Sequence, residues 1–399
     1  MTYLTGIIVL VIGLVVSIAL HELGHFIPAK KFGILTPQYM IGFGPTLWSR
    51  QIGETEVGIK AILLGGYVRM VGMYAPGREG RKTHNRKGEL TWAEQARQDA
   101  MAEIPPGEEH RAFYAKPVWQ RLIVMVSGTL VNLVLSLVCV GLALGAIGVN
   151  LPTREIASLS AGSPAVAADL RVGDKVVAVN GQATPDWASV QAQIAKAEAG
   201  KGATLTVERQ DETLVIAIVP EPKDGRSIIG VMPKETRHRA GPVEILAYEW
   251  EMAVGTAKIL VALPVKLWET VVNLFQPEKP RDSNSVMGIV GMGQVAGQIA
   301  SAEAPGFGLA DKFASFLMLM GSLNLTLFMF NLIPLMPLDG GQAAGAIYEA
   351  IRRAWRKARG LPDLGPVDLA RALPLTASVV FAFIAMTVLL IVADILKPI

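Results

Sequence analysis

Four long apolar runs constrain the fold of this chain more than any other feature. They occupy residues 4–20, 118–149, 313–336 and 373–393. Each is close to the ~20 residues that a helix needs to cross the hydrocarbon core of a bilayer. Charged residues make up 18% of the chain, which is below the level of about a quarter that is typical of soluble domains. We therefore predict a polytopic α-helical membrane protein with four transmembrane helices.

Charge and cysteine content narrow the class further. A net charge of +3 is too small and too diffuse to predict a nucleic-acid partner. Cys139 is the only cysteine, so the chain cannot form an internal disulfide. A signal peptide is an alternative for the first run. That run lacks a basic start, however, and HELGHF follows it instead of a small-x-small cleavage site.

Basic residues in the connections predict the orientation of the runs. The first connection carries, among others, Lys30, Lys31, Arg78, Arg81, Lys82, Arg86, Lys87, Arg111 and Lys116, and the third carries Arg352, Arg353, Arg356, Lys357 and Arg359. Lysine and arginine accumulate in cytoplasmic loops. We therefore expect these two connections to be cytoplasmic, and both termini and the middle segment to be extracytoplasmic.

The middle segment, 151–239, has a soluble composition. SAGSPAVAADLRVGDKVVAVNG predicts a turn, a short helix, a strand and an Asn-Gly hairpin turn, and three further strands follow. This order resembles a PDZ domain, an α+β fold whose open sheet edge beside a helix accepts an extended peptide. A small α+β domain that only spaces the helices is the alternative.

These features divide the chain into four parts. Residues 1–150 hold the first two transmembrane helices, and 151–239 form the PDZ-like domain. Residues 240–309 hold an amphipathic helix on the outer surface, interrupted near Pro264, and then a Gly-rich loop that enters the protein. A fifth crossing by 241–276 is the alternative, although it conflicts with the loop charges. Residues 310–399 hold the third and fourth transmembrane helices.

The motif HELGH ends the first apolar run. His21 and His25 are four residues apart, so they share one face of a helix and can hold one zinc ion, while Glu22 can reach a water on that ion. Zinc lowers the pKa of such a water to about 7. Glu22 would take the proton of the water and pass it to a leaving amine. Ionisable residues in a membrane span are costly, which favours a functional site.

A catalytic zinc takes three protein ligands and leaves one position open, so a third ligand is needed. His84, His110 and His238 lie in polar stretches that predict surface positions. Asp339 follows an apolar run in NLIPLMPLDGG, where prolines interrupt the helix. We predict Asp339 as the third ligand. Capping of the next helix by Asp339 is the alternative.

HELGHF, NxxPxxPLDGG and the PDZ-like insertion together resemble the site-2 protease family of intramembrane zinc metalloproteases. The resemblance implies that Zn²⁺ is bound by His21, His25 and Asp339, and that Glu22 is the catalytic base. It implies a substrate-binding role for Asn331. SGTLVN resembles the family's small-residue-then-Asn motif, which adds Gly128 and Asn132 to the substrate-binding candidates. Residues 40–71 resemble the family's membrane-associated β-loop.

The same resemblance implies the biology. Substrates would be single-pass membrane proteins, such as anti-sigma factor-like proteins and remnant signal peptides, in the lipid bilayer of a bacterial inner membrane. An upstream site-1-type protease would first cut them outside the membrane. Two alternatives are a membrane-bound PDZ scaffold or chaperone with a non-catalytic metal site, and a metal transporter. Asp394 is a candidate residue for a transport path.

Overall fold

The structure, a computed structural model, describes residues 2–77, 83–197, 200–223, 226–276, 281, 285–303 and 306–398. Arg78, Arg81 and Lys82 of the first connection lie outside the described residues. The chain forms two compact units, Met1–Ala143 with Gly241–Ile399, and Leu144–Ala240.

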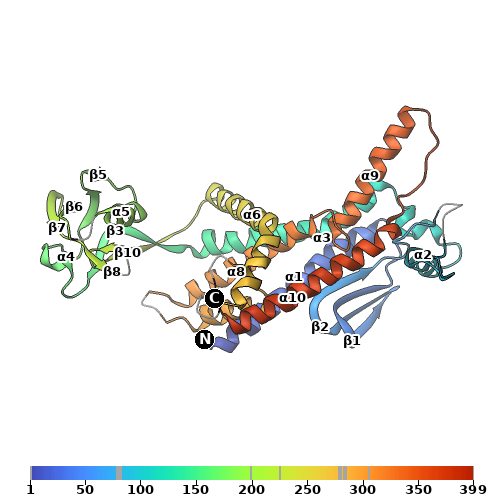
Figure 1. Cartoon of the computed structure of the whole chain (residues 1–399), viewed down its shortest axis with the longest axis horizontal. Helices are drawn as coiled ribbons and strands as arrows, with labels where there is room; N and C mark the ends of the chain where they lie inside the picture. Colours follow the sequence, from blue (N-terminus) through green and yellow to red (C-terminus); the bar gives the residue numbers. More distant parts are fainter. Residues whose placement is uncertain are drawn as a thin grey trace. The chain divides into compact units, whose positions relative to one another are not determined.

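Four helices in the described residues are long and apolar enough to cross a membrane, as predicted. They are α1 (Tyr3–Lys31), α3 (Val118–Val140) continued to Ile147, α8 (Leu309–Asn331), and α10 (Leu373–Leu396) preceded by the turn η4 (Leu369–Ala372). A helix suits the bilayer because it satisfies its backbone polar groups internally. Helix α3 packs against both α1 and α8 (Figure 1).

Small residues bring α1 and α3 close together. A Cβ built on Gly24 of α1 would lie 2.7 Å from the Cα of Gly128 on α3. Such contacts let the backbones of membrane helices approach closely, as at other small-residue interfaces. The crossing lies within the turn that carries the HELGH histidines, so it fixes their position relative to α3.

The predicted Gly-rich loop is wrong, because its residues form the helix α7 (Ile289–Ser301). Its small residues face α1: a Cβ on Gly297 would lie 2.4 Å from the ring of Tyr3. The backbone N–H groups of Gly288 and Gly291 donate to Asp394 Oδ2 over 2.9 and 2.7 Å. The helix forms because a carboxylate satisfies its first orphan N–H groups.

The predicted break at Pro264 is also wrong. Helix α6 runs from Pro242 to Leu274 without interruption, and it is not among the four candidate spans. Glu249 on α6 is buried, and its Oε1 accepts a hydrogen bond of 3.0 Å from the hydroxyl of Ser136 on α3. This contact anchors α6 to the helical bundle.

The predicted β-loop region forms a bent hairpin of β1 (Gln38–Ile52) and β2 (Thr55–Arg69). The first part of β1 pairs with both ends of β2, so the strand segments 46–52 and 66–69 lie at the two edges. Gly42 and Gly44 allow the bend, with φ of +95° and +81°. The Tyr39 hydroxyl donates to Ala19 O over 2.6 Å and ties the hairpin to α1.

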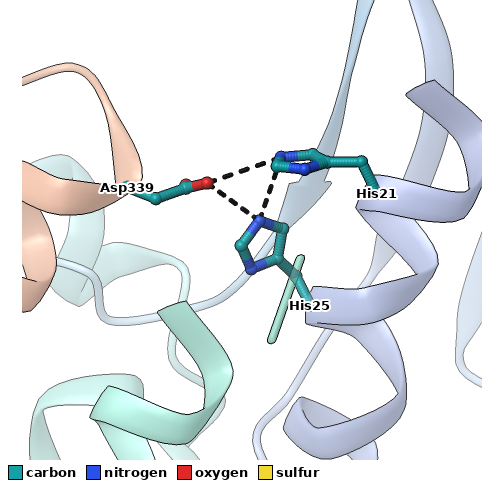
Figure 2. A group of neighbouring side chains, drawn as sticks. All are labelled: His21, His25 and Asp339. Atoms are coloured by element: carbon teal, nitrogen blue, oxygen red, sulfur yellow. Dashed lines mark hydrogen bonds and ion pairs between the residues drawn. The ribbon is translucent and has the colours of Figure 1, made fainter. Parts of the chain in front are cut away.

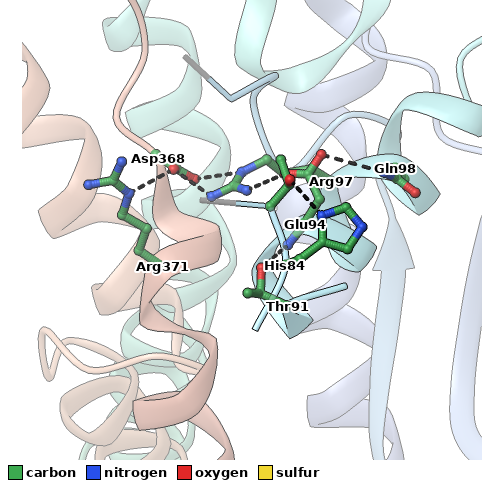
Figure 3. Close-up of polar contacts among 8 residues, drawn as sticks. His84, Thr91, Glu94, Arg97, Gln98, Asp368 and Arg371 are labelled. Atoms are coloured by element: carbon green, nitrogen blue, oxygen red, sulfur yellow. Dashed lines mark hydrogen bonds and ion pairs between the residues drawn. The ribbon is translucent and has the colours of Figure 1, made fainter. Parts of the chain in front are cut away.

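A charged cluster joins helix α2 (Trp92–Ala102) to η4, as Figure 3 shows. The buried guanidinium of Arg97 donates through Nη2 and Nε to both oxygens of Asp368, over 2.6 and 3.1 Å. Its Nη1 lies 2.8 Å from Glu94 Oε2. Bidentate arginine–carboxylate pairs are geometrically specific, so this cluster fixes α2 against the start of α10.

Two short turns, η1 (Glu109–Arg111) and η2 (Phe113–Ala115), connect α2 to α3.

The second unit is an antiparallel sheet with short helices. Its sheet order is β10 (Val231–His238), β3 (Val149–Leu159), β4 (Lys175–Val179), β6 (Ala203–Arg209) and β7 (Glu212–Ile218). The remaining elements are α4 (Pro164–Ala167), β5 (Gln182–Ala183), α5 (Trp187–Lys196), β8 (Glu221–Lys223) and β9 (Arg226–Ile228). Asn180 and Gly181 both have positive φ, as the expected hairpin turn requires. Buried residues such as Val176, Val190 and Leu205 give the unit its own core.

Candidate metal centre

Helix α1 presents His21 and His25 one turn apart on the same face. Their Nε2 atoms lie 3.2 Å from each other, and the side chain of His25 is buried (Figure 2). The helical spacing alone produces this pairing, because residues i and i+4 lie one above the other.

Asp339 completes the group from the other end of the chain. Helix α8 ends at Asn331, a short turn follows, and Asp339 is the first residue of α9 (Asp339–Ala358). Its Oδ2 lies 3.4 Å from His21 Nε2 and 3.2 Å from His25 Nε2. Leu338 is the N-cap residue of α9, and the cap has no side-chain hydrogen bond. The capping alternative for Asp339 is therefore wrong.

Two glycines make the tight entry into α9 possible. A Cβ on Gly340 would lie 2.4 Å from Ile333 O, and one on Gly341 would lie 2.6 Å from Met336 N. Any side chain here would push the preceding turn away. The glycines of LDGG thus let Asp339 reach the histidines.

The three side chains fit zinc. Ligand atoms about 2.0–2.1 Å from a tetrahedral zinc lie roughly 3.3 Å apart. The observed separations of 3.2, 3.2 and 3.4 Å match this spacing. Among the described residues, this is the single group of three or more His, Cys, Asp or Glu donors close enough to share an ion. Two imidazoles and one carboxylate also match the donor set of hydrolytic zinc sites.

Neighbouring polar groups orient the three side chains. His25 Nδ1–H donates to Val124 O over 2.7 Å, which leaves Nε2 as the free lone pair. The amide of Asn132 lies 3.1 Å from His21 Nδ1. The Thr129 hydroxyl donates to Asp339 Oδ2 over 3.2 Å. All three contacts come from α3, and Thr129 was not among the residues predicted from the sequence. Thr129 lies one helical turn before Asn132 on an otherwise apolar helix, and this spacing could have indicated that the two side chains share a polar face.

Gly128 gives His25 its space. A Cβ at this position would lie 2.2 Å from His25 Nε2, so only glycine fits. The predicted substrate-binding candidates Gly128 and Asn132 thus both lie beside the histidines, and Asn331 is half-buried at the end of α8. Their role in binding substrate stays a prediction.

Glu22 lies on α1 between the two histidines and is buried. It is not part of the three-donor group. The hairpin covers it, because a Cβ on Gly66 of β2 would lie 2.8 Å from Glu22 Cγ. The carboxylate is therefore enclosed between α1 and an edge segment of the hairpin.

Other ionisable residues named from the sequence lie elsewhere. His84, His110 and His238 do not join the three-donor group. Asp394 is buried and pairs with Arg281 at 2.8 Å. Asp394 is therefore part of a buried ion pair near the start of α7. This pairing argues against its role as an unpaired charge on a metal-transport path.

Comparison with known proteins identifies the family. The sequence profile of peptidase family M50 matches residues 9–362. The chain belongs to peptidase family M50. This is the site-2 protease family, so the resemblance predicted from the motifs is confirmed.

Relatives of this M50 peptidase are named as proteases, and several of them as zinc metalloproteases. "Zinc metalloprotease Rip1" of Mycobacterium bovis is 30% identical over 438 residues, covering 100% of this chain and 99% of the relative. "Regulator of sigma-W protease RasP" of Bacillus subtilis is 27% identical over 390 residues, covering 83% and 87%. This chain is accordingly an enzyme, a zinc metallopeptidase of the M50 family with Zn²⁺ as its cofactor.

Proposed function

We propose that this M50 peptidase cleaves peptide bonds within the transmembrane segments of single-pass membrane proteins. His21, His25 and Asp339 hold the zinc, and Glu22 is the general base. One observation carries the proposal: two histidines on α1, a helix apolar enough to span a bilayer, meet Asp339 at the start of α9 with zinc spacing. Ionisable side chains in a membrane span are costly, so His21 and His25 on α1 favour a functional site.

The chain's own residues divide the chemistry. When bound, zinc supplies a Lewis acid that polarises a peptide carbonyl and acidifies water. Glu22 removes a proton from the attacking water and later delivers it to the leaving amine nitrogen. Asn132, Thr129 and the carbonyl of Val124 hold the three ligands in orientation.

The hairpin offers a way to expose a helical substrate. A peptide bond in a helix resists hydrolysis because its carbonyl is already hydrogen-bonded and sterically covered. Segment 66–69 of β2 is an edge of the hairpin sheet, and Gly66 lies against Glu22. A substrate segment that unwinds can add to this edge as a strand, which replaces its lost hydrogen bonds beside the catalytic group.

We further propose that the unit Leu144–Ala240 is a PDZ-like domain on the extracytoplasmic side, with both termini on that side and the basic connections in the cytoplasm of a bacterial cell. A groove of about 350 Å³ lies between α5 and segment 227–231, and its lining includes Trp187, Ile194 and Val231. Such a groove accepts an extended peptide end. This fits substrates already shortened outside by an upstream site-1-type protease.

Anti-sigma factor-like proteins and remnant signal peptides are the proposed substrates. The relative named as a regulator of a sigma-W pathway supports the first class. The test is co-expression of candidate single-pass proteins with wild-type enzyme, Glu22→Gln and Glu54→Gln. Glu54 lies at the exposed tip of the hairpin and is the matched control.

Glu22→Gln should retain zinc and lose cleavage, whereas Glu54→Gln should cleave normally. Normal cleavage by purified Glu22→Gln enzyme would show that Glu22 is not the base. If wild-type enzyme cleaves the soluble part of substrates but leaves their transmembrane segments intact, the proposal of intramembrane cleavage is wrong.

A further inference from the structure

Helix α9 carries an apolar stripe that faces away from the protein. The stripe consists of Ile347, Tyr348, Ile351 and Trp355, which follow one another at helical spacing. All four are exposed, and Ile351 is 63% exposed. In a helix on the surface of a soluble protein, this face would instead be buried against the core.

The polar face of α9 is directed inward. Glu349 is fully buried and pairs with Arg121 of α3 at 2.5 Å and with Arg353 at 3.0 Å. Arg352 donates to Gly365 O, and Arg356 Nε donates to Pro362 O over 2.7 Å. The charged side chains of α9 thus contact α3 and the returning loop, and the apolar stripe is left outward.

The place of α9 in the chain sets the surroundings of this stripe. The candidate span α8 precedes it, and the candidate span Leu369–Leu396 follows it. Both ends of α9 are therefore tied to the same face of the membrane. The tryptophan and tyrosine of the stripe are residue types that are enriched at membrane interfaces.

The far end of α9 adds positive charge. Lys357 and Arg359 are exposed, and the Arg359 guanidinium lies 4.2 Å from the centroid of the Trp355 ring. Basic residues beside an apolar face attract anionic headgroups when a helix lies in the interface. An uncharged membrane or protein surface would not offer complementary negative charge to Lys357 and Arg359, so these residues favour an anionic partner.

We propose that α9 is an interfacial helix whose apolar stripe enters the cytoplasmic leaflet, with Lys357 and Arg359 bound to anionic lipid headgroups. Because α9 begins at Asp339, this contact also fixes the depth of that residue relative to the membrane surface. The stated partner is a membrane surface that contains anionic lipid, not a second copy of the chain or a soluble protein.

The test places a nitroxide spin label at single cysteines in the full chain, in a background with Cys139→Ser. Ile351→Cys reports on the stripe, Tyr348→Cys repeats the measurement, and Ala350→Cys is the exposed control on the same helix but off the stripe. The protein is reconstituted in vesicles of phosphatidylglycerol and phosphatidylcholine, or of phosphatidylcholine alone. Collisions with oxygen, which concentrates in lipid, are compared with collisions with a nickel chelate, which stays in water.

We expect the oxygen-to-nickel ratio at positions 348 and 351 to exceed that at 350 several-fold, and to fall when phosphatidylglycerol is omitted. Equal ratios at all three positions would place the stripe in water and overturn the proposal. Exclusion of both reagents at 348 and 351 would show that protein covers the stripe, which also overturns it. A ratio that does not depend on phosphatidylglycerol would refute the binding of anionic headgroups.

Discussion

The side-chain amide of Asn132 lies 3.1 Å from Nδ1 of His21, and the amide oxygen has no hydrogen-bond partner among the described residues. When Nε2 of a histidine binds a metal, Nδ1 carries the proton and needs an acceptor. The amide orientation that places its oxygen toward Nδ1 supplies that acceptor. Asn132 therefore serves to fix the tautomer and the ring orientation of His21.

Asn132→Leu removes this acceptor at similar volume. We expect zinc affinity to fall by about 10–100-fold, the usual cost of losing a partner of a metal-ligating histidine. Competition with a chromogenic chelator measures it. Asn132→Asp keeps an oxygen acceptor and should hold zinc far better than Leu. Equal zinc affinity in the Leu variant and the wild type would remove this role from Asn132.

Gly128→Ala inserts a methyl group 2.2 Å from His25 Nε2 and pushes α3 away from α1. We expect a loss of stability of about 1–3 kcal/mol from overpacking, together with a loss of bound zinc. Gly141→Ala is the matched control, since a Cβ there meets nothing within 4 Å. Thermal unfolding in detergent and metal analysis test both variants. A Gly128→Ala protein with full zinc content would show that the helices can shift to admit the methyl group.

Glu349→Ala leaves Arg121 buried without its carboxylate. Breaking a buried ion pair costs about 3–5 kcal/mol, so we expect a large fall in unfolding stability. Arg353→Ala removes the more exposed partner of Glu349 and should cost at most about 1 kcal/mol. Denaturation in detergent ranks the two variants. Similar losses for both would mean that the Arg121 pair contributes no more than a surface pair.

Acid should destabilise the unit Leu144–Ala240 through Asp174. Burial acts to raise the pKa of this carboxyl, but Arg209, which donates twice over 2.7 Å, and the backbone N–H of Arg171 hold it below its usual range. Because the folded-state pKa is below the unfolded value of about 3.9, the contribution of the ion pair to stability is complete above about pH 5 and is lost as pH falls toward and through the folded-state pKa.

Denaturant unfolding of a 144–240 fragment at several pH values tests this. Asp174→Asn should be less stable than wild type at neutral pH, and the difference should shrink in acid. Asp211→Asn is a control at a turn position with φ of +68°, which asparagine tolerates. A constant difference between Asp174→Asn and wild type across this pH range would contradict the ion-pair explanation.

The four spans and the pairing of HELGH with Asp339 could be predicted because each rests on a strong local signal. Length and apolarity define a span, and helical spacing places His21 beside His25. A catalytic zinc needs a third protein ligand, and this requirement led to the prediction that Asp339 lies beside the two histidines. The structure places Asp339 there.

Other features depend on tertiary contacts that no local pattern encodes. Residues 289–301 look like a loop because they are rich in glycine, yet the contact of Gly297 with Tyr3 and the carboxylate of Asp394 make them helical. Pro264 lies at an exposed position inside α6, where the helix continues although proline removes one backbone hydrogen bond. The hydrogen bond between Thr129 and Asp339 depends on how α3 is rotated about its own axis, and the sequence does not determine that rotation.

The origin of the three donors from opposite ends of the chain has a consequence for biosynthesis. The histidines enter the membrane with the first helix, whereas Asp339 follows only after α8 has been inserted. During translation the nascent enzyme therefore has two of its three metal donors and lacks the third. If these three residues hold the zinc as proposed, hydrolytic activity should begin only after Asp339 has joined the histidines, when most of the polypeptide has already been synthesised.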